Sequence, residues 1–243
     1  MVRKAERITV LTGAGISTDS GIPDYRGPNG VWTRDPKAER LATYDDYVND
    51  PEVRRESWRK RIEHPAWEAT PNAAHDALVE LERAGRLRAL ITQNVDGLHQ
   101  RAGSSAESVI EIHGTIWFAE CVSCGDRRPM AELMARVRAG EPDPACAMCG
   151  GIVKSATISF GQALDPAVLT AAVEAAQDCD LFLAVGTSLA VHPAAGLCEI
   201  AVRAGASLVI VNAQPTPYDD LADAVIREPI GDALPVLLAS AVG

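Results

Sequence analysis

The chain has 243 residues, enough for one large domain or for one domain that carries a smaller insertion. Hydrophobic residues make up 47% and aromatic residues only 5%, which is typical of an α/β protein with an aliphatic core. The formal net charge of -10 argues against nonspecific nucleic-acid binding, which needs a positive surface, and fits either a solubilising surface or attraction to a basic, lysine-bearing partner.

Segments typical of strands and of helices alternate along the chain. Short β-rich or apolar runs predict strands over residues 7–11, 87–92, 109–112, 180–185 and 207–211. Helical spacing predicts helices over residues 72–84, 167–176, 193–204 and 232–242, the last with Asp232 as its N-cap. Strands and helices in this order indicate an α/β fold, a Rossmann-like parallel sheet with helices on both faces.

Two stretches interrupt this alternation and are interpreted as insertions. Residues 30–70 are rich in charge and tryptophan and have helical character, and residues 116–154 contain four of the six cysteines. We expect a small domain from these two stretches, a helical module plus a zinc ribbon. The Rossmann-like domain is then discontinuous, over residues 1–29, 71–115 and 155–243.

The cysteines of the second stretch have the spacing of a zinc ribbon. A loop of about 21 residues separates two C-x-x-C pairs, which are Cys121 with Cys124 and Cys146 with Cys149. Four thiolates that close a tetrahedron leave no position for substrate, so the expected zinc ion is structural. A redox dithiol or disulfides are the alternatives. Cys179 and Cys198 are expected to be buried thiols.

The first predicted strand runs into a glycine turn. Gly13 and Gly15 match the first two glycines of the dinucleotide fingerprint G-x-G-x-x-G, but Thr18 stands at the third. The acid that a dehydrogenase carries ~20 residues later falls in residues 33–36, which do not end a strand. Hydride transfer is therefore disfavoured, whereas backbone N–H groups at a helix start still suit phosphate oxygens.

Further polar clusters follow the turn and the next two strands. Residues 21–26, GIPDYR, combine an acid, an aromatic ring and a cation, for which a simple Asp24–Arg26 ion pair is the structural alternative. Residues 92–96, TQNVD, follow a strand, where amides and an acid suit ribose hydroxyls and a carboxamide. His113 ends the next strand beside a glycine and is a general-base candidate. The other four histidines are expected to be structural.

The sequence carries no signal for a membrane or for export. No apolar run approaches the ~20 residues of a membrane span, and residues 1–4 lack the apolar stretch of a secretory signal. We expect a cytoplasmic protein without a membrane partner. A direct nucleic-acid role is not expected either, because the loop between the cysteine pairs lacks an aromatic stacking platform.

Several short motifs occur in one order along nearly the whole chain. They are GAGIS (13–17), GIPDYR (21–26), TQNVD (92–96), HG (113–114), the four cysteines, FG (160–161), GTSLAVHPAA (186–195) and VNAQPT (211–216). Together they resemble the sirtuin family, the NAD-dependent protein-lysine deacylases. The resemblance implies NAD as co-substrate, one structural Zn²⁺ and an acyl-lysine protein or peptide as substrate. It places the active site between an NAD-binding Rossmann-like domain and the small domain.

The resemblance also implies roles for individual residues, with His113 and Asn94 catalytic. The residues implied in cofactor binding are Gly13, Ala14, Gly15, Ser17, Asp24, Tyr25, Arg26, Trp32, Gln93, Asn94, Val95, Asp96, Gly186, Thr187, Ser188, Asn212, Ala213, Gln214, Asp232 and Ala233. Those implied in substrate binding are Phe160, Gly161, Gln162, Leu189, Val191, Trp58 and Arg61. The peptide is expected to add as a strand between the segments around 160–161 and 189–191.

The implied reaction uses NAD as a glycosyl donor. The acyl oxygen of the substrate attacks C1′ of the nicotinamide ribose, and nicotinamide leaves. His113 accepts a proton from the ribose hydroxyls, so that the 2′-oxygen attacks the imidate carbon. Water then releases free lysine and 2′-O-acyl-ADP-ribose. A dry, acid-lined pocket would stabilise the oxocarbenium-like transition state.

Three positions depart from the family pattern. Gln162 replaces an acid next to the peptide, and Tyr25 replaces the commoner phenylalanine of the NAD loop. Sirtuins that remove succinyl or malonyl groups carry Tyr-x-x-Arg, where this chain has Trp58-x-x-Arg61. The missing phenol favours acetyl or other uncharged acyl groups. The alternative for the basic cluster around Arg61 is a solvated helix face.

Two alternatives to a deacylase remain open. A mono-ADP-ribosyltransferase on the same scaffold would leave label from NAD on protein. A non-catalytic NAD-sensing or zinc-ribbon binding module would bind NAD without releasing nicotinamide. The set of Gln93, Asn94, Asp96 and His113 argues against the binding module.

Overall fold

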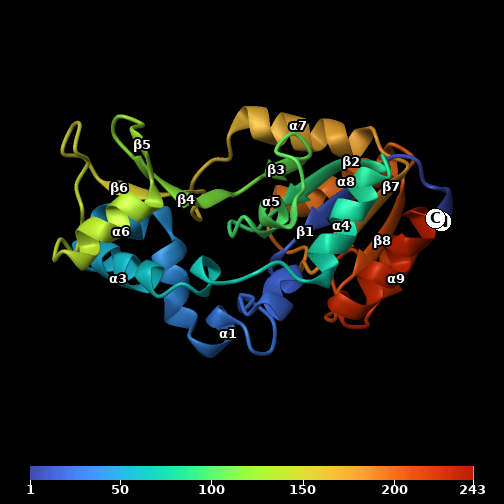
Figure 1. Ribbon diagram of the computed structural model, residues 1–243, viewed down its shortest axis with the longest axis horizontal. Helices are drawn as coiled ribbons and strands as arrows, with labels where there is room; N and C mark the ends of the chain where they lie inside the picture. Colours follow the sequence, from blue (N-terminus) through green and yellow to red (C-terminus); the bar gives the residue numbers. More distant parts are fainter. Residues whose placement is uncertain (243) are drawn as a thin grey trace.

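The main sheet has six parallel strands, and the computed structural model describes it together with the rest of residues 1–242 (Figure 1). The strand order is β3-β2-β1-β7-β8-β9. The bounds are Ile8–Thr12 (β1), Leu87–Thr92 (β2), Val109–Glu111 (β3), Leu181–Val185 (β7), Ser207–Val211 (β8) and Ala224–Ile226 (β9). Because β1 pairs with β2 on one side and with β7 on the other, the strand order reverses beside β1. Ligands of open parallel sheets bind at such a point.

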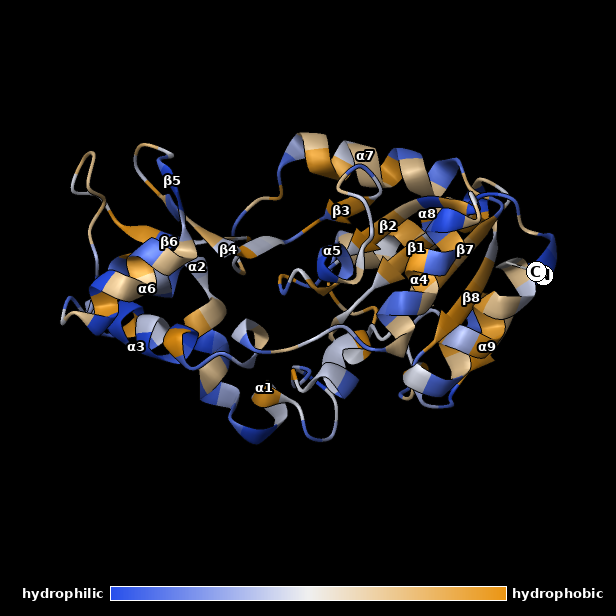
Figure 2. Ribbon diagram, viewed as in Figure 1, coloured by the Kyte–Doolittle hydropathy of each residue, from blue (hydrophilic) through white to orange (hydrophobic). Residues whose placement is uncertain are grey.

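Helices cover both faces of this sheet. They are α4 (Ala73–Arg83), α5 (Leu98–Ala102), α7 (Pro166–Gln177), α8 (Leu197–Arg203) and α9 (Ile230–Val242). Alternate residues of β1 enter two cores: Val10 packs with α4 and α9, and Leu11 packs with α7 and α8. The strands between these layers are mainly apolar, as the orange colour of β7 and β8 in Figure 2 shows. Within residues 1–242, no helix has both the length and the apolarity that a membrane crossing requires.

A second body stands at one end of the sheet, at the left of Figure 1. It contains a three-stranded antiparallel sheet in the order β5-β4-β6. Its elements are α1 (Val31–Arg34), α2 (Tyr44–Asn49), α3 (Pro51–Ile62), β4 (Gly114–Cys121), β5 (Arg127–Pro129), α6 (Met130–Arg138) and β6 (Val153–Thr157). Its core packs Trp58 of α3 against Ala119 of β4 and against Met130 and Leu133 of α6. A parallel sheet with a separate small sheet confirms the predicted fold class.

The predicted strands and helices are present within two residues of their expected bounds, except for the helix expected over residues 193–204. There residues 194–196 form a 3₁₀ helix, and α8 begins only at Leu197. The predicted cap is also wrong: α9 begins at Ile230, so Asp232 lies in its first turn and is not its N-cap. The helix expected after the glycine turn is a 3₁₀ helix (Ala14–Ser20), which ends at Gly21 with φ 85°. The sequence does not predict β9, because its three residues are too short a run to stand out.

Candidate active site

Two glycine turns meet where the strand order reverses. A Cβ on Gly13 would lie 2.7 Å from the Gly186 carbonyl oxygen, and a Cβ on Gly15 would lie 2.7 Å from the Gly186 Cα. The turn after β1 and the turn after β7 therefore pack so closely that both positions require glycine. Thr18, at the third fingerprint position, donates from its hydroxyl to Gly15 O at 2.9 Å within the 3₁₀ helix. Packing of the two turns explains the glycines at positions 13 and 15, whereas the side chain at position 18 serves the 3₁₀ helix.

Gln93 connects the ends of the central strands and orients His113. Its Nε2 donates to the Thr187 hydroxyl at 2.9 Å, and its main-chain N donates to Thr12 O at 2.9 Å. Its carbonyl oxygen lies 3.1 Å from His113 Nδ1. A carbonyl oxygen only accepts, so Nδ1 carries the proton and Nε2 has a free lone pair. Burial lowers the pKa of His113, so its ring is neutral at pH 7 and Nε2 is available as a base.

Asn94 and Asp96 form a buried polar network with Ser17. Asn94 Nδ2 donates to Gly13 O at 3.1 Å and to Ser17 Oγ at 3.2 Å, which leaves Asn94 Oδ1 as a free acceptor. The Ser17 hydroxyl donates to Asp96 Oδ2 at 2.8 Å, and Leu98 N–H donates to Asp96 Oδ1 at 2.9 Å. Burial raises the pKa of the Asp96 carboxyl, and these hydrogen bonds oppose that shift.

The GIPDYR loop contributes an aromatic cluster. The rings of Tyr25 and Trp32 are 4.6 Å apart between centroids, and those of Trp32 and Phe160 are 5.4 Å apart. The Arg26 guanidinium carbon lies 4.6 Å from the Trp32 ring centroid, a cation–π contact. Asp24 accepts a main-chain N–H of its own turn. Within residues 1–242 no Asp24–Arg26 ion pair forms, so that structural alternative is wrong.

One cleft of about 1410 Å³, lined by both bodies, brings together most of the residues that the sequence singles out. The residues in its lining are Gly13, Ala14, Gly15, Ser17, Asp24, Tyr25, Arg26, Trp32, Arg61, Gln93, Asn94, Val95, Asp96, His113, Phe160, Gly161, Gln162, Gly186, Thr187, Ser188, Val191, Asn212 and Gln214. Five others are outside the lining, namely Trp58, Leu189, Ala213, Asp232 and Ala233. Leu189 is buried as a whole residue, so the structure shows no surface of it for the predicted contact with a peptide.

Trp58 does not reach the cleft. Its side chain is 0% exposed and lies in the core of the second body, so the predicted direct contact with substrate is wrong. Burial of this large ring is what anchors α3 to β4 and α6. Arg61, one turn later, lines the cleft instead, and its guanidinium carbon lies 5.0 Å from the Trp58 ring centroid.

Two cations line the wall of the cleft that the second body provides. Arg61 Nη2 donates to Ser155 Oγ at 3.0 Å, whereas Nη1 is buried without a hydrogen-bond partner within residues 1–242. Lys154 is 6% exposed, and burial lowers its pKa to about 8, with Arg61 adding to the shift. The phenol of Tyr47 also lines the cleft and donates to Val153 O at 2.8 Å, two residues before Ser155. In the part of the chain that the structure describes, neither cation forms an ion pair with a carboxylate.

The segment expected to bind a peptide is already paired along one edge. Phe160 N donates to Ala42 O, and Tyr44 N donates to Phe160 O, both at 2.9 Å. Gln162 turns back on this segment, because its Oε1 accepts from Ser159 N at 3.2 Å. A peptide strand would therefore use the opposite edge, and the Gln162 amide is engaged within its own turn.

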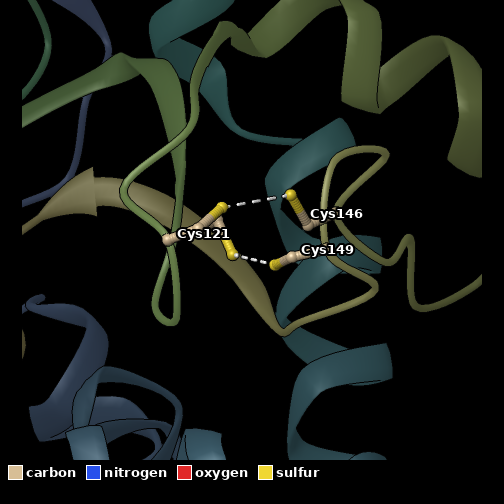
Figure 3. A group of neighbouring side chains, drawn as sticks. Cys121, Cys146 and Cys149 are labelled. Atoms are coloured by element: carbon tan, nitrogen blue, oxygen red, sulfur yellow. Dashed lines mark hydrogen bonds between the residues drawn. The ribbon is translucent and has the colours of Figure 1, made fainter.

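The four cysteines of the ribbon converge on one point (Figure 3). Their Sγ atoms all lie within 4.8 Å of one another, with 3.5 Å between Cys121 and Cys149 and 3.7 Å between Cys124 and Cys146. Zinc with Zn–S bonds of about 2.3 Å in a tetrahedron separates its sulfurs by about 3.8 Å. All four are free thiols, so the disulfide alternative is wrong. The donor set fits one closed structural Zn²⁺ site.

Several residues outside the motifs have environments that the sequence reveals only in part. Cys179 and Cys198 are buried as expected, which raises their pKa values to about 11 and about 12 and keeps both thiols protonated. Of the four histidines expected to be structural, two are buried and two line the cleft, His64 and His192. Tyr47 and Lys154 also line the cleft without a sequence signal, since they lie in unrelated stretches that only the fold brings together.

The family assignment comes from comparison with known proteins. The model of the Sir2 family matches residues 13–193, which include the glycine turn, both polar strand ends and the cysteine pairs. The chain belongs to the Sir2 family. The resemblance to sirtuins that the motifs indicate is thereby confirmed.

Relatives of this Sir2-family chain cover it almost from end to end. NAD-dependent protein deacetylase 2 of Streptomyces coelicolor is 60% identical over 231 residues, which are 95% of this chain and 96% of that protein. NAD-dependent protein deacetylase 1 of Bradyrhizobium diazoefficiens is 46% identical over 96% of this chain and 91% of that protein. A solved Sir2–p53 peptide–NAD⁺ structure has a TM-score of 0.88 and 34% identity and covers 98% of this chain and 94% of that chain.

Proposed function

We propose that this Sir2-family chain is an NAD-dependent protein-lysine deacetylase. It transfers the acyl group of a substrate lysine to ADP-ribose and releases nicotinamide, free lysine and 2′-O-acyl-ADP-ribose. The observation that carries the proposal is the juxtaposition, in one cleft, of the neutral His113 base with buried Asn94 and Asp96 beside the glycine turns. Relatives named NAD-dependent protein deacetylase support the same activity.

Different residues of the cleft bind different parts of NAD. The glycine turn beside Gly13 receives the pyrophosphate. Asn94 Oδ1 accepts from a hydroxyl of the nicotinamide ribose, and Asp96 binds the nicotinamide carboxamide. Ser188 and Asn212, at the carboxyl ends of β7 and β8, meet the adenosine half. Their place in the lining of one continuous cleft supports this assignment.

The chemistry needs one base and a dry pocket. After the acyl oxygen attacks C1′ and nicotinamide leaves, His113 Nε2 accepts a proton from the ribose hydroxyls. The 2′-oxygen then attacks the imidate carbon, and water completes the release of lysine. The aromatic cluster of Tyr25, Trp32 and Phe160 limits the access of bulk water to the oxocarbenium-like transition state.

The test is a product analysis of the zinc-loaded protein with NAD and an acetyl-lysine peptide. We expect nicotinamide, deacetylated peptide and acetyl-ADP-ribose in equal amounts by mass spectrometry. ADP-ribose attached to protein with no change in the peptide would identify a mono-ADP-ribosyltransferase instead. If NAD is not consumed in this assay, the protein is a non-catalytic binding module.

The buried cations favour a second substrate class beside acetyl-lysine. The absence of a phenol at position 58 favours uncharged acyl groups, but Tyr47 brings a phenol from another element to the lining of the same cleft as Arg61. An acyl chain that ends in a carboxylate would give the buried Arg61 Nη1 a partner and offset the charge of Lys154. Acetyl remains the first candidate, and a succinyl-type chain is the second.

A variant pair separates the two acyl classes. Arg61→Met should reduce the kcat/KM for a succinyl-lysine peptide more than that for an acetyl-lysine peptide. Arg59→Met is the control, because Arg59 lies on the same helix with its side chain 67% exposed. Equal losses on both peptides would assign Arg61 a structural role only.

We keep the cytoplasm as the proposed location. The six cysteines are free thiols, and paired C-x-x-C metal ligands are typical of reducing compartments. Fractionation of cells that express the tagged protein tests this location.

A further inference from the structure

A set of buried polar side chains lies behind the cleft. His75 of α4 and His99 of α5 are 0% and 1% exposed, and their ring centroids are 4.9 Å apart. Thr12 and Thr92, the last residues of β1 and β2, are 0% and 2% exposed. None of these four side chains belongs to the lining of the cleft, so none is placed to touch NAD or peptide.

The hydrogen bonds among these residues have a definite direction. Asn72 N–H donates to His75 Nδ1 at 3.3 Å, so the proton of the neutral His75 ring is on Nε2. Thr12 Oγ1 donates its only proton to Thr92 Oγ1 at 2.9 Å. The 3.0 Å contact between Thr12 Oγ1 and His99 Nε2 therefore needs an N–H on the ring. His99 thus carries its proton on Nε2 and has a bare Nδ1.

Each of the two neighbouring rings has one nitrogen without a partner. His75 Nε2, a donor, and His99 Nδ1, an acceptor, are the two ring nitrogens of this pair that have no hydrogen-bond partner within residues 1–242. Burial lowers the pKa of His75 to about 4 and that of His99 to about 3, so both rings are neutral at pH 7. A proton added to His99 Nδ1 would be buried without an acceptor among the described residues and is therefore opposed.

The other end of the chain of hydrogen bonds is Asn94. Thr92 Oγ1 accepts from Asn94 N–H at 3.1 Å, in addition to the hydroxyl of Thr12. The side chain of Asn94 is fixed by Gly13 O and Ser17 Oγ. The threonine hydroxyls therefore hold the main chain from which the Asn94 amide extends, and His99 determines how these hydroxyls are oriented.

We propose that His99 is a positioning residue for catalysis: its Nε2–H orients Thr12 and Thr92 and thereby holds the main chain of Asn94, and with it the amide that faces the nicotinamide ribose. The inference rests on the proposed function for the role of Asn94. It assigns a function to buried groups that make no contact with either substrate.

Thr12→Val is the first test, because valine keeps the shape of the side chain and removes the hydroxyl. We expect the kcat for nicotinamide release to fall about tenfold or more, because a small displacement of a reacting group is costly. The KM for the peptide should not change. Thr9→Val is the matched control: Thr9 is also buried on β1, but its hydroxyl donates to Ala175 O on the opposite face. Equal kcat values for the two variants would overturn the inference.

Two substitutions of His99 test whether the donor itself matters. Glutamine places an amide N–H near the position of Nε2, whereas phenylalanine fills the space without a donor. We expect His99→Gln to keep most of the wild-type kcat and a folded His99→Phe to lose about tenfold or more. A folded His99→Phe protein with the rate of His99→Gln would contradict the proposal. If the phenylalanine variant does not fold, the comparison of Thr12→Val with Thr9→Val still tests the proposal.

The tautomer of His99 has a spectroscopic signature that does not require turnover. Nitrogen-15 NMR of the wild-type protein should show the proton of His99 on Nε2. A proton on Nδ1 would overturn the inference whether or not the protein consumes NAD. The proposed function fails separately, when the wild-type protein leaves NAD and the acetyl-lysine peptide intact.

Discussion

His113 and Asn94 both direct their N–H groups into the protein, toward main-chain carbonyl oxygens of Gln93 and Gly13. Each therefore presents an acceptor to the cleft, Nε2 of the imidazole and Oδ1 of the amide. Ribose hydroxyls are donors, so this pair suits a sugar more than a phosphate. At the residue scale, the specificity of the site follows from which atoms the surrounding main chain leaves free.

Replacement of His113 by alanine should lower the kcat for deacetylation by about 10²–10⁴, the usual contribution of a general base. The fold should survive, because the ring is half-buried and the hydrogen bond that it makes is to Gln93 O. Steady-state kinetics and thermal unfolding check this. His192→Ala is the control, since it removes another histidine that lines the cleft. Unchanged turnover in the His113 variant would reject its assignment as the base.

The pH profile of kcat should reflect the protonation of His113. Burial lowers the pKa of this ring below its ordinary value of 6.5, and only the neutral ring accepts a proton. The rate should therefore decrease as the pH falls, and the midpoint of this decrease should lie below pH 6.5. An acidic limb with its midpoint above 6.5 would show that another group limits the reaction.

The polar clusters of the site are predictable because each occupies a few consecutive residues at a strand end. The sequence alone does not predict which face of α3 is buried. Val53 and Trp58 are buried there, but most of the helix is charged, so no clear apolar stripe marks its inner face. Tertiary packing turns Trp58 inward and leaves Arg61 in the lining of the cleft, together with Tyr47 of another helix. For this reason the prediction that Trp58 contacts the substrate is wrong, although Arg61, one turn later, lines the cleft.

The zinc ribbon should be the element that metal removal affects. Cys146→Ser removes one of four ligands, and a structural zinc site contributes directly to folding. We expect loss of the bound zinc, a lower temperature of unfolding and protease cleavage within residues 122–151. The core of the six-stranded sheet contains none of the four ligands, so ADP-ribose binding should persist. Cys179→Ser is the control and should keep one zinc per chain, as measured by metal analysis.

At the scale of the whole molecule, His113 lies at the junction of the two bodies. Its carbonyl oxygen accepts from Ile158 N at 2.8 Å, where the strand entering the small sheet and the strand leaving it run side by side. The predicted domain boundaries, with residues 30–70 and 116–154 in the small domain and the remainder in the Rossmann-like domain, stay a prediction. The small sheet itself begins at Gly114 and ends at Thr157, so a hinge there would move the base relative to NAD.

Buried histidines make the stability of the whole molecule depend on pH. Burial lowers the pKa of His75 to about 4 and that of His99 to about 3, whereas histidine in an unfolded chain has a pKa of about 6.5. Between these values the unfolded chain binds more protons, so the free energy of unfolding decreases as the pH falls from 6.5. Ion-paired carboxylates such as Asp178, whose pKa is lowered, add to this loss only at pH values near and below 3.8. Asp96, with a raised pKa, acts in the opposite direction.

The buried histidines therefore cause most of the change in the free energy of unfolding between pH 6.5 and 4.5. The variant His75→Gln measures the contribution of one of them. Glutamine does not titrate, and at the third position of α4 it can keep the capping box with Asn72. We expect the temperature of unfolding of the wild-type protein to decrease steadily across this range, and the His75→Gln protein to show a shallower decrease. His192→Gln, at an exposed position, should keep the wild-type slope. Circular dichroism at a series of pH values measures all three, and a wild-type slope in His75→Gln would mean that His75 is not the group that titrates.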